Sequence, residues 1–142
     1  MNLEDQKKRA VEFLHACDVG DVQKIEAHID TGFHFQFMER AASWSVDGKE
    51  VSTRLDRDNF LKYGVTATKA VTRDGMHFKV HLAISEGPYV ALFGESNATS
   101  LTGKRYNNIY CWRFTFAGDK VLELLEFCDT HHAHQVLFDQ AP

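Results

Sequence analysis

The alternation of apolar and polar residues is most regular in the last third of the chain. The run from Tyr106 to Phe116 places on one face Tyr106, Asn108, Tyr110, Trp112, Phe114 and Phe116. The run from Val121 to Asp129 places on one face Glu123, Leu125, Phe127 and Asp129. Because side chains of a strand alternate between its faces, each run predicts a half-buried strand. The turn at residues 117–120 joins the two runs into a β-hairpin.

Further strands are predicted upstream of this hairpin. Residues 76–85 alternate regularly, and their apolar face consists of Met76, Phe78, Val80, Leu82 and Ile84. After the turn at residues 87–88, a strand from Tyr89 to Leu101 has one face made of Tyr89, Ala91, Phe93, Glu95, Asn97 and Thr99. Residues 33–37 indicate an earlier strand, and residues 44–53 fit a short hairpin around the Asp47–Gly48 turn.

Apolar residues at helical spacing predict the remaining elements. Helices are expected at residues 3–16, 22–29, 56–68 and 130–138. Asp21 fits the N-cap of the second helix, because its carboxylate can accept free amide hydrogens there. The element order lacks β-α-β alternation, so a doubly wound parallel sheet is not expected. We predict an α+β fold in which residues 1–142 form a single domain.

Composition narrows the classes of function. The chain has 142 residues, of which 44% are hydrophobic and 25% charged, as in soluble globular domains. The net charge of −4, without a block of like charges, argues against nucleic-acid binding. Three cysteines without CxxC spacing predict reduced thiols in a cytoplasmic protein. Neither a signal peptide nor a membrane span is expected.

The C-terminal hairpin also carries a family resemblance. Its motif residues are Gly103, Lys104, Tyr106, Asn107 and Asn108, then the Asp119–Lys120 turn, then Glu126, Phe127, Asp129 and Thr130. This pattern resembles the SnoaL-like family of the nuclear-transport-factor-2-like (NTF2-like) and ketosteroid-isomerase-like superfamily. The resemblance implies a curved, mostly antiparallel sheet wrapped around N-terminal helices, forming a cone with a central pocket. It also implies a homodimer through the exposed sheet face. Because functions in this superfamily are diverse, it indicates fold more than activity.

Two carboxylates are the candidates for catalysis. Asp129 ends the last strand on the face of Phe127, and apolar surroundings disfavour a charged carboxylate, which suits a general acid or base. Asp129 equally fits the N-cap of the following helix. Glu95 shares a strand face with Phe93. If that face lines a pocket, Glu95 and Asp129 would supply one acid and one base. If it faces water, or if a bulge reverses the strand, Glu95 is an ordinary surface residue.

Further residues on the predicted pocket faces are candidates for binding. The predicted substrate-binding residues are Phe93, Asn97, Asn108, Tyr110, Trp112 and Phe127. The two asparagines and the tyrosine could donate hydrogen bonds to a developing oxyanion. His131 and His134 could share a helix face, but zinc usually takes three or four ligands and no second cluster accompanies them. We therefore expect no metal and no other cofactor.

The resemblance leaves several activities open. SnoaL-like cyclases use an Asp/His pair, and the imidazole here would come from His34, His77 or His81, of which the last two are expected to face solvent or a dimer partner. Epoxide-hydrolase-like relatives need an Arg-x-Asp where this chain has residues 95–97, Glu-Ser-Asn, so epoxide hydrolysis is in doubt. No convincing match to the oxyanion-hole Asp of ketosteroid isomerase is found, which disfavours steroid isomerisation.

The favoured hypothesis is a cofactor-independent isomerase or cyclase. It would act by proton transfer on a hydrophobic, carbonyl-containing small molecule, with Asp129 and Glu95 as the acid–base pair. Three competing functions are a binding module without catalysis, an epoxide-hydrolase-like enzyme, and a dimeric association domain whose pocket is filled by its own side chains. The sequence alone does not decide among them.

Overall fold

The computed structural model describes residues 1–38, 43–46, 49–52 and 54–138, and it confirms the predicted α+β fold. Its helices are α1 (Leu3–Val19), α2 (Val22–His28), α3 (Arg57–Asn59), α4 (Val65–Val71) and α5 (Thr130–Ala133), with π-helical turns at Phe60–Gly64 and His134–Phe138. Its strands are β1 (Ile29–Phe37), β2 (Ser43–Val46), β3 (Lys49–Ser52), β4 (Arg54–Asp56), β5 (Lys79–Glu86), β6 (Tyr89–Glu95), β7 (Ala98–Thr99), β8 (Arg105–Tyr106), β9 (Ile109–Ala117) and β10 (Lys120–Cys128).

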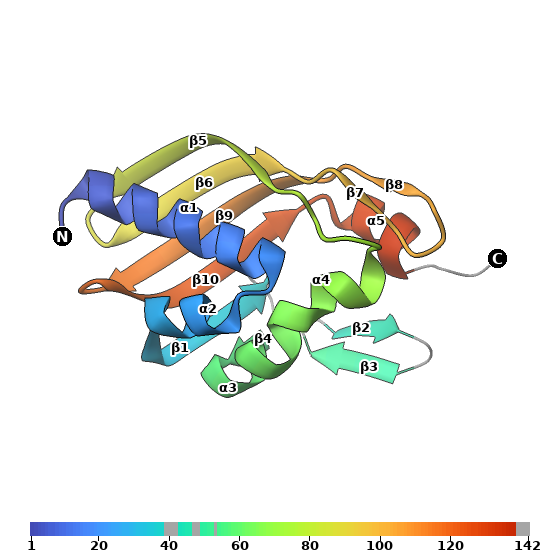
Figure 1. Ribbon diagram of the computed structural model, residues 1–142, viewed down its shortest axis with the longest axis horizontal. Coiled ribbons are helices and arrows are strands. Elements are labelled where there is room, and N and C mark those ends of the chain that lie inside the picture. Colours follow the sequence, from blue (N-terminus) through green and yellow to red (C-terminus); the bar gives the residue numbers. More distant parts are fainter. Residues whose placement is uncertain (39–42, 47–48, 53, 139–142) are drawn as a thin grey trace.

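Six of these strands form one curved sheet in the order β4-β1-β10-β9-β6-β5 (Figure 1). Neighbouring strands are antiparallel except β1 and β10, which run parallel. Helix α1 lies across one face of this sheet and packs on β5 and β6 (Figure 1). The mostly antiparallel, curved sheet around the N-terminal helices is therefore confirmed. The predicted hairpin at residues 44–53 appears as β2 and β3, whereas its turn at residues 47–48 lies outside the described residues.

The core between α1 and the sheet is aromatic. The Phe13 ring lies 5.7 Å from Phe114 and 6.2 Å from both Phe33 and Phe60, measured between ring centroids. Trp112 on the same face of β9 is fully buried. The predicted inward face of residues 106–116 is thus confirmed, because its even-numbered residues are all buried. Aromatic pairs of this kind stabilise a fold beyond the area that they bury.

The predicted inward face of residues 76–85 is wrong in its second half. The pairing of β5 with β6 shifts register between Val80 and Leu82. Leu82 and Ile84 are consequently about half exposed, at 53% and 51%, and Ala83 packs against the core instead. An extra residue in one strand of a pair reverses the inward–outward alternation of the side chains that follow it. The alternation of apolar and polar residues in this strand did not indicate the bulge.

Gly94 is required by the close approach of β5 to β6. A Cβ atom at this position would collide with the carbonyl oxygen of Lys79 and lie 3.1 Å from the Trp112 ring. We expect Gly94→Ala to lower the free energy of unfolding by about 3 kcal/mol, because backbone and a buried ring must both move. Chemical denaturation measures this loss. Gly32→Ala is the matched control, since its Cβ would have only ordinary contacts at 3.5 Å, and an equal loss in both variants would contradict the steric explanation.

Candidate functional site

A cavity of about 290 Å³ lies inside the cone, between the sheet and the helices α1 and α4. Its described lining is almost wholly apolar and comprises Leu14, Cys17, Phe35, Phe37, Leu55, Phe60, Tyr63, Gly64, Ala67, Thr68, Val71, Met76, Phe78, Tyr106, Tyr110, Trp112, Leu124, Glu126, Ala133, Leu137 and Phe138. Among these residues one carboxylic acid is present, and it belongs to Glu126. A concave, apolar pocket with few polar groups is the usual form of a small-molecule site.

Glu126 reaches the cavity from β10. The strand alternation directs Leu124 and Glu126 inward, and Glu126 faces Trp112 on the neighbouring strand β9. The Trp112 indole Nε1 donates a hydrogen bond of 2.9 Å to Glu126 Oε1. Glu126 is half-buried and lines the cavity, so its carboxyl group is partly withdrawn from bulk water.

The surroundings of Glu126 change its protonation. Burial disfavours the charged carboxylate and raises the pKa of Glu126 from 4.5 to about 7, against the smaller opposing effect of the hydrogen bond from Trp112. A carboxyl group with a pKa near neutrality is divided between acid and base at physiological pH. It can therefore both accept and return a proton without a large energetic penalty in either direction.

Two tyrosine hydroxyls provide further polar atoms of this wall. The hydroxyl groups of Tyr106 and Tyr110 lie 3.1 Å apart, and Asn108 Nδ2 donates to the Tyr106 hydroxyl at 2.8 Å. Burial raises the pKa of both tyrosines, so both hydroxyls stay protonated. Asn108 is fixed in turn, because its side chain also bonds both backbone groups of Asp129, at 2.9 and 3.0 Å. Within the pair Tyr110 donates its proton to Tyr106, so Tyr106 is the hydroxyl that can still donate to a ligand.

Solved structures resemble the fold of this chain over nearly its whole length. An NTF2-like protein of unknown function from Burkholderia pseudomallei superposes with a TM-score of 0.75 at 12% identity, covering 96% of this chain and 98% of that one. The chain has the NTF2-like fold. A putative polyketide cyclase from Acidithiobacillus ferrooxidans gives a TM-score of 0.70 at 17% identity, covering 99% and 100%. TerC co-crystallised with polyporic acid gives 0.70 at 17% identity, covering 90% and 97%. No protein-family model and no curated protein sequence matches the chain.

Within this NTF2-like cone, Asp129 does not occupy the position predicted for it. It is exposed, follows the last residue of β10, and accepts a hydrogen bond of 3.2 Å from the backbone nitrogen of His132. It is thus the N-cap of α5, the structural role that its position before a helix also predicted. Beyond the register shift between Val121 and Glu123, the residues of β10 that line the cavity are Leu124 and Glu126, so an acid at 126 enters the cavity whereas one at 129 does not.

Glu95 also lies away from the cavity, which corrects the predicted Glu95–Asp129 pair. Its side chain is 47% exposed on the outer face of the sheet and lies 3.5 Å from His81. Phe93, Asn97 and Phe127 are likewise absent from the cavity lining. The inward side of β6 consists of Val90, Leu92 and Gly94, so the large outer residues of this strand indicated the wrong face.

Of the predicted binding residues, Tyr110 and Trp112 do line the cavity, and Asn108 lies buried behind Tyr106. Glu126 and Tyr106 were not predicted as site residues from the sequence. A signal existed for Glu126, because it lies two residues after Leu124 on a strand predicted to pair with the aromatic run of β9. A carboxyl group buried among apolar side chains requires a hydrogen-bond partner, and Trp112 provides it.

His34, a candidate imidazole, belongs to a polar cluster on the outer face of the sheet. Its Nε2 lies 2.6 Å from Glu123 Oε2, and Arg113 donates to the same carboxylate. Burial opposes ionisation of Glu123, but the hydrogen bonds from Arg113 and His34 outweigh it and lower the pKa of Glu123. This cluster joins β1, β10 and β9 and is separated from the cavity by the sheet.

The described residues contain no group of three or more His, Cys, Asp or Glu side chains that could hold a metal ion. The histidines at 131 and 134 lie at the start of the C-terminal helical segment, and His132 stacks on Tyr106 with ring centroids 5.3 Å apart. None of the described helices has the length and hydropathy to cross a membrane.

Proposed function

We propose that this protein binds a hydrophobic, carbonyl-containing small molecule in its cavity and moves a proton on it with Glu126. The observation that carries the proposal is a carboxyl group with a pKa of about 7 in an apolar cavity. The cavity volume of about 290 Å³ is close to the lower limit for small-molecule pockets, which is roughly 300 Å³. TerC, with the same fold, was crystallised with a small molecule, polyporic acid, which supports a ligand of this kind.

The proposed chemistry begins with Glu126 as the base. The carboxylate takes a proton from the carbon next to the carbonyl group, and the electrons of that C–H bond move into an enolate. The hydroxyl group of Tyr106, which accepts hydrogen bonds from Tyr110 and Asn108, is the donor that would stabilise the enolate oxygen. In an isomerase the acid form of Glu126 returns the proton to another carbon. In a cyclase the enolate carbon attacks a second carbonyl group, and the proton goes to the resulting alkoxide.

Deuterium exchange tests this proposal without knowledge of the natural substrate. The protein is incubated in D₂O with a hydrophobic cyclic ketone such as 2-tetralone, and loss of the proton next to the carbonyl is followed by NMR. We expect the rate to exceed the buffer rate and to follow the ionised fraction of Glu126, rising with pH through about 7. Binding of the ketone without accelerated exchange would favour the binding module instead.

Epoxide hydrolysis and a purely associative role have less support. Among the described lining residues of the cavity there is neither an arginine nor an aspartate, so the groups of an epoxide-hydrolase-like site are missing there. The open volume also argues against an association domain whose pocket is filled by its own side chains. A ligand-binding module without catalysis is the second candidate, favoured by how few polar groups the cavity offers.

Homodimerisation through the outer face of the sheet stays a prediction. The face carries exposed apolar side chains on β5, β6 and β9, namely Leu82, Ile84, Tyr89, Phe93 and Ile109. The flanking groups have both signs of charge, as a self-complementary two-fold interface needs. We expect light scattering to give twice the chain mass and Ile84→Glu to give a monomer. A monomeric wild type would contradict the prediction, and Val19→Glu, on the exposed end of α1, is the control.

A further inference from the structure

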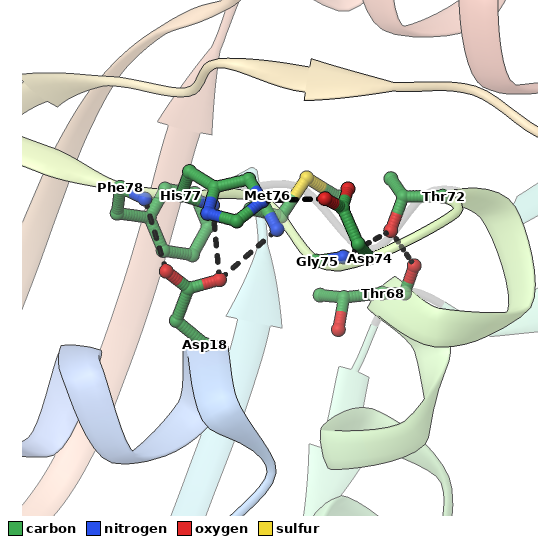
Figure 2. A network of polar contacts seen from close by, with 8 residues as sticks. All are labelled: Asp18, Thr68, Thr72, Asp74, Gly75, Met76, His77 and Phe78. Atoms are coloured by element: carbon green, nitrogen blue, oxygen red, sulfur yellow. Dashed lines mark hydrogen bonds and ion pairs between the residues drawn. The ribbon is translucent and has the colours of Figure 1, made fainter. Parts of the chain in front are cut away.

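Asp18 connects the end of α1 to the wall of the cavity. Its Oδ1 accepts hydrogen bonds from the backbone nitrogens of Met76 and His77, at 3.0 and 3.1 Å, and its Oδ2 accepts one from Phe78, at 3.1 Å (Figure 2). An acid in the last turn of a helix is disfavoured by the helix dipole. Three backbone amides that converge on one carboxylate provide the compensating interaction.

The segment that Asp18 holds has an irregular backbone. It lies between α4 and β5, and its amides at 76–78 precede the first ladder position of β5. Gly75 has a φ of +102° and His77 a φ of +52°, a left-handed conformation that residues with a Cβ atom adopt only under constraint. Thr72 supports the same segment, because its hydroxyl accepts from the Gly75 nitrogen at 3.1 Å (Figure 2).

This segment also forms a wall of the cavity, through the side chains of Met76 and Phe78. The Phe78 ring packs edge-on against Tyr110 and Trp112, with ring centroids 5.3 and 5.1 Å away. Tyr110 and Trp112 stack on each other at 4.7 Å, and Trp112 donates to Glu126. A chain of direct contacts therefore runs from the Asp18 carboxylate through Phe78 and Trp112 to Glu126.

We infer that Asp18 is a positioning residue of the cavity: its carboxylate fixes residues 76–78 so that Phe78 stays packed on Trp112 and closes the wall around Glu126. The inference rests on the proposed function for its catalytic meaning. The positioning of residues 76–78 by Asp18 does not depend on any substrate, because it concerns only how well Glu126 is shielded from water. Asp18→Asn keeps one acceptor oxygen but turns an NH₂ group toward backbone N–H groups, so the segment loses part of its attachment.

The test is the titration of Glu126, followed by NMR of carboxyl carbons in protein labelled with ¹³C-glutamate. The signal of Glu126 is assigned by its loss in Glu126→Gln. In the wild type we expect a pKa of about 7. In Asp18→Asn we expect it to fall by at least about one unit, a tenfold loss in proton affinity, because water enters the opened wall. Phe78→Leu, which keeps the Asp18 charge, should shift the pKa in the same direction.

Controls separate positioning from general destabilisation. Asp21→Ala removes the N-cap bond of 3.1 Å to the Lys24 nitrogen, in a helix with no residue in the described cavity lining. It should lower stability but leave the Glu126 titration unchanged. If Asp18→Asn does not fold alone, it is combined with His77→Gly, because glycine adopts the positive φ at that position without strain.

An unchanged Glu126 titration in a folded Asp18→Asn variant overturns the inference. A shift that disappears at about 0.5 M salt also overturns it, since it would then come from the removed charge alone. The double variant Asp18→Asn/Phe78→Leu should titrate like the more affected single variant, because both changes act through one contact. Failure of the deuterium exchange assay with an intact titration result would remove the proposed function and leave the positioning role.

Discussion

Glu126→Gln should slow deuterium exchange at the carbon next to the ketone by at least about 100-fold, the usual contribution of a general base. Glutamine has the shape of glutamate, and its oxygen can keep the 2.9 Å hydrogen bond from Trp112. What the variant loses is the ability to take up a proton. Affinity for the ketone should therefore change little, and the effect should appear in the exchange rate measured at saturating ketone.

Asp129→Asn and Glu95→Gln are the matched controls for this experiment. Both exchange a carboxylate for its amide outside the cavity, and asparagine serves as an N-cap about as well as aspartate. We expect both variants to retain the wild-type exchange rate. Loss of exchange in Asp129→Asn together with an active Glu126→Gln would return the catalytic role to the residue that the strand alternation favours.

The fold was largely predictable because its signals are local. The hairpin of β9 and β10 follows from alternation and a short turn, and α1 and α2 follow from helical spacing and the Asp21 cap, which bonds the Lys24 nitrogen. These features depend on neighbouring residues alone. The curvature and the cavity instead depend on how distant elements pack, and they were expected only because the hairpin motif resembles a known family.

The candidate site was predicted less well, because strand parity decides which residues enter the cavity. On β9 the aromatic alternation identified the inner face, and Tyr110 and Trp112 were placed correctly. On β6 the inner face holds Val90, Leu92 and Gly94, and the close approach to Lys79 leaves no room for a side chain at position 94. The aromatic side chains of this strand, Tyr89 and Phe93, lie on the outer face, and Glu95 was therefore predicted on the wrong side. A close approach between strands is not visible in a single strand's pattern.

The dependence of stability on pH gives the second large effect expected for Glu126. The folded protein has a pKa of about 7 at this residue, compared with 4.5 for an unperturbed glutamate. Between these values the folded state keeps a proton that the unfolded state has released. The free energy of unfolding must then fall as the pH rises through this window, by about 3 kcal/mol in total. Below the window both states are protonated, and above it the cost stays constant.

Comparison with Glu126→Gln isolates this contribution, because every other titrating group is shared. We expect the variant and the wild type to have similar stabilities near pH 4.5 and the variant to be more stable at pH 8, with the difference growing between the two values. Urea denaturation at a series of pH values measures it. Glu123 contributes a pH dependence of the opposite sign, because its lowered pKa makes the free energy of unfolding fall under acid conditions. This contribution is the same in both proteins and cancels in the comparison. Parallel stability curves would show that Glu126 titrates as an ordinary surface carboxylate, and the acid–base role proposed for it would then lose its physical basis.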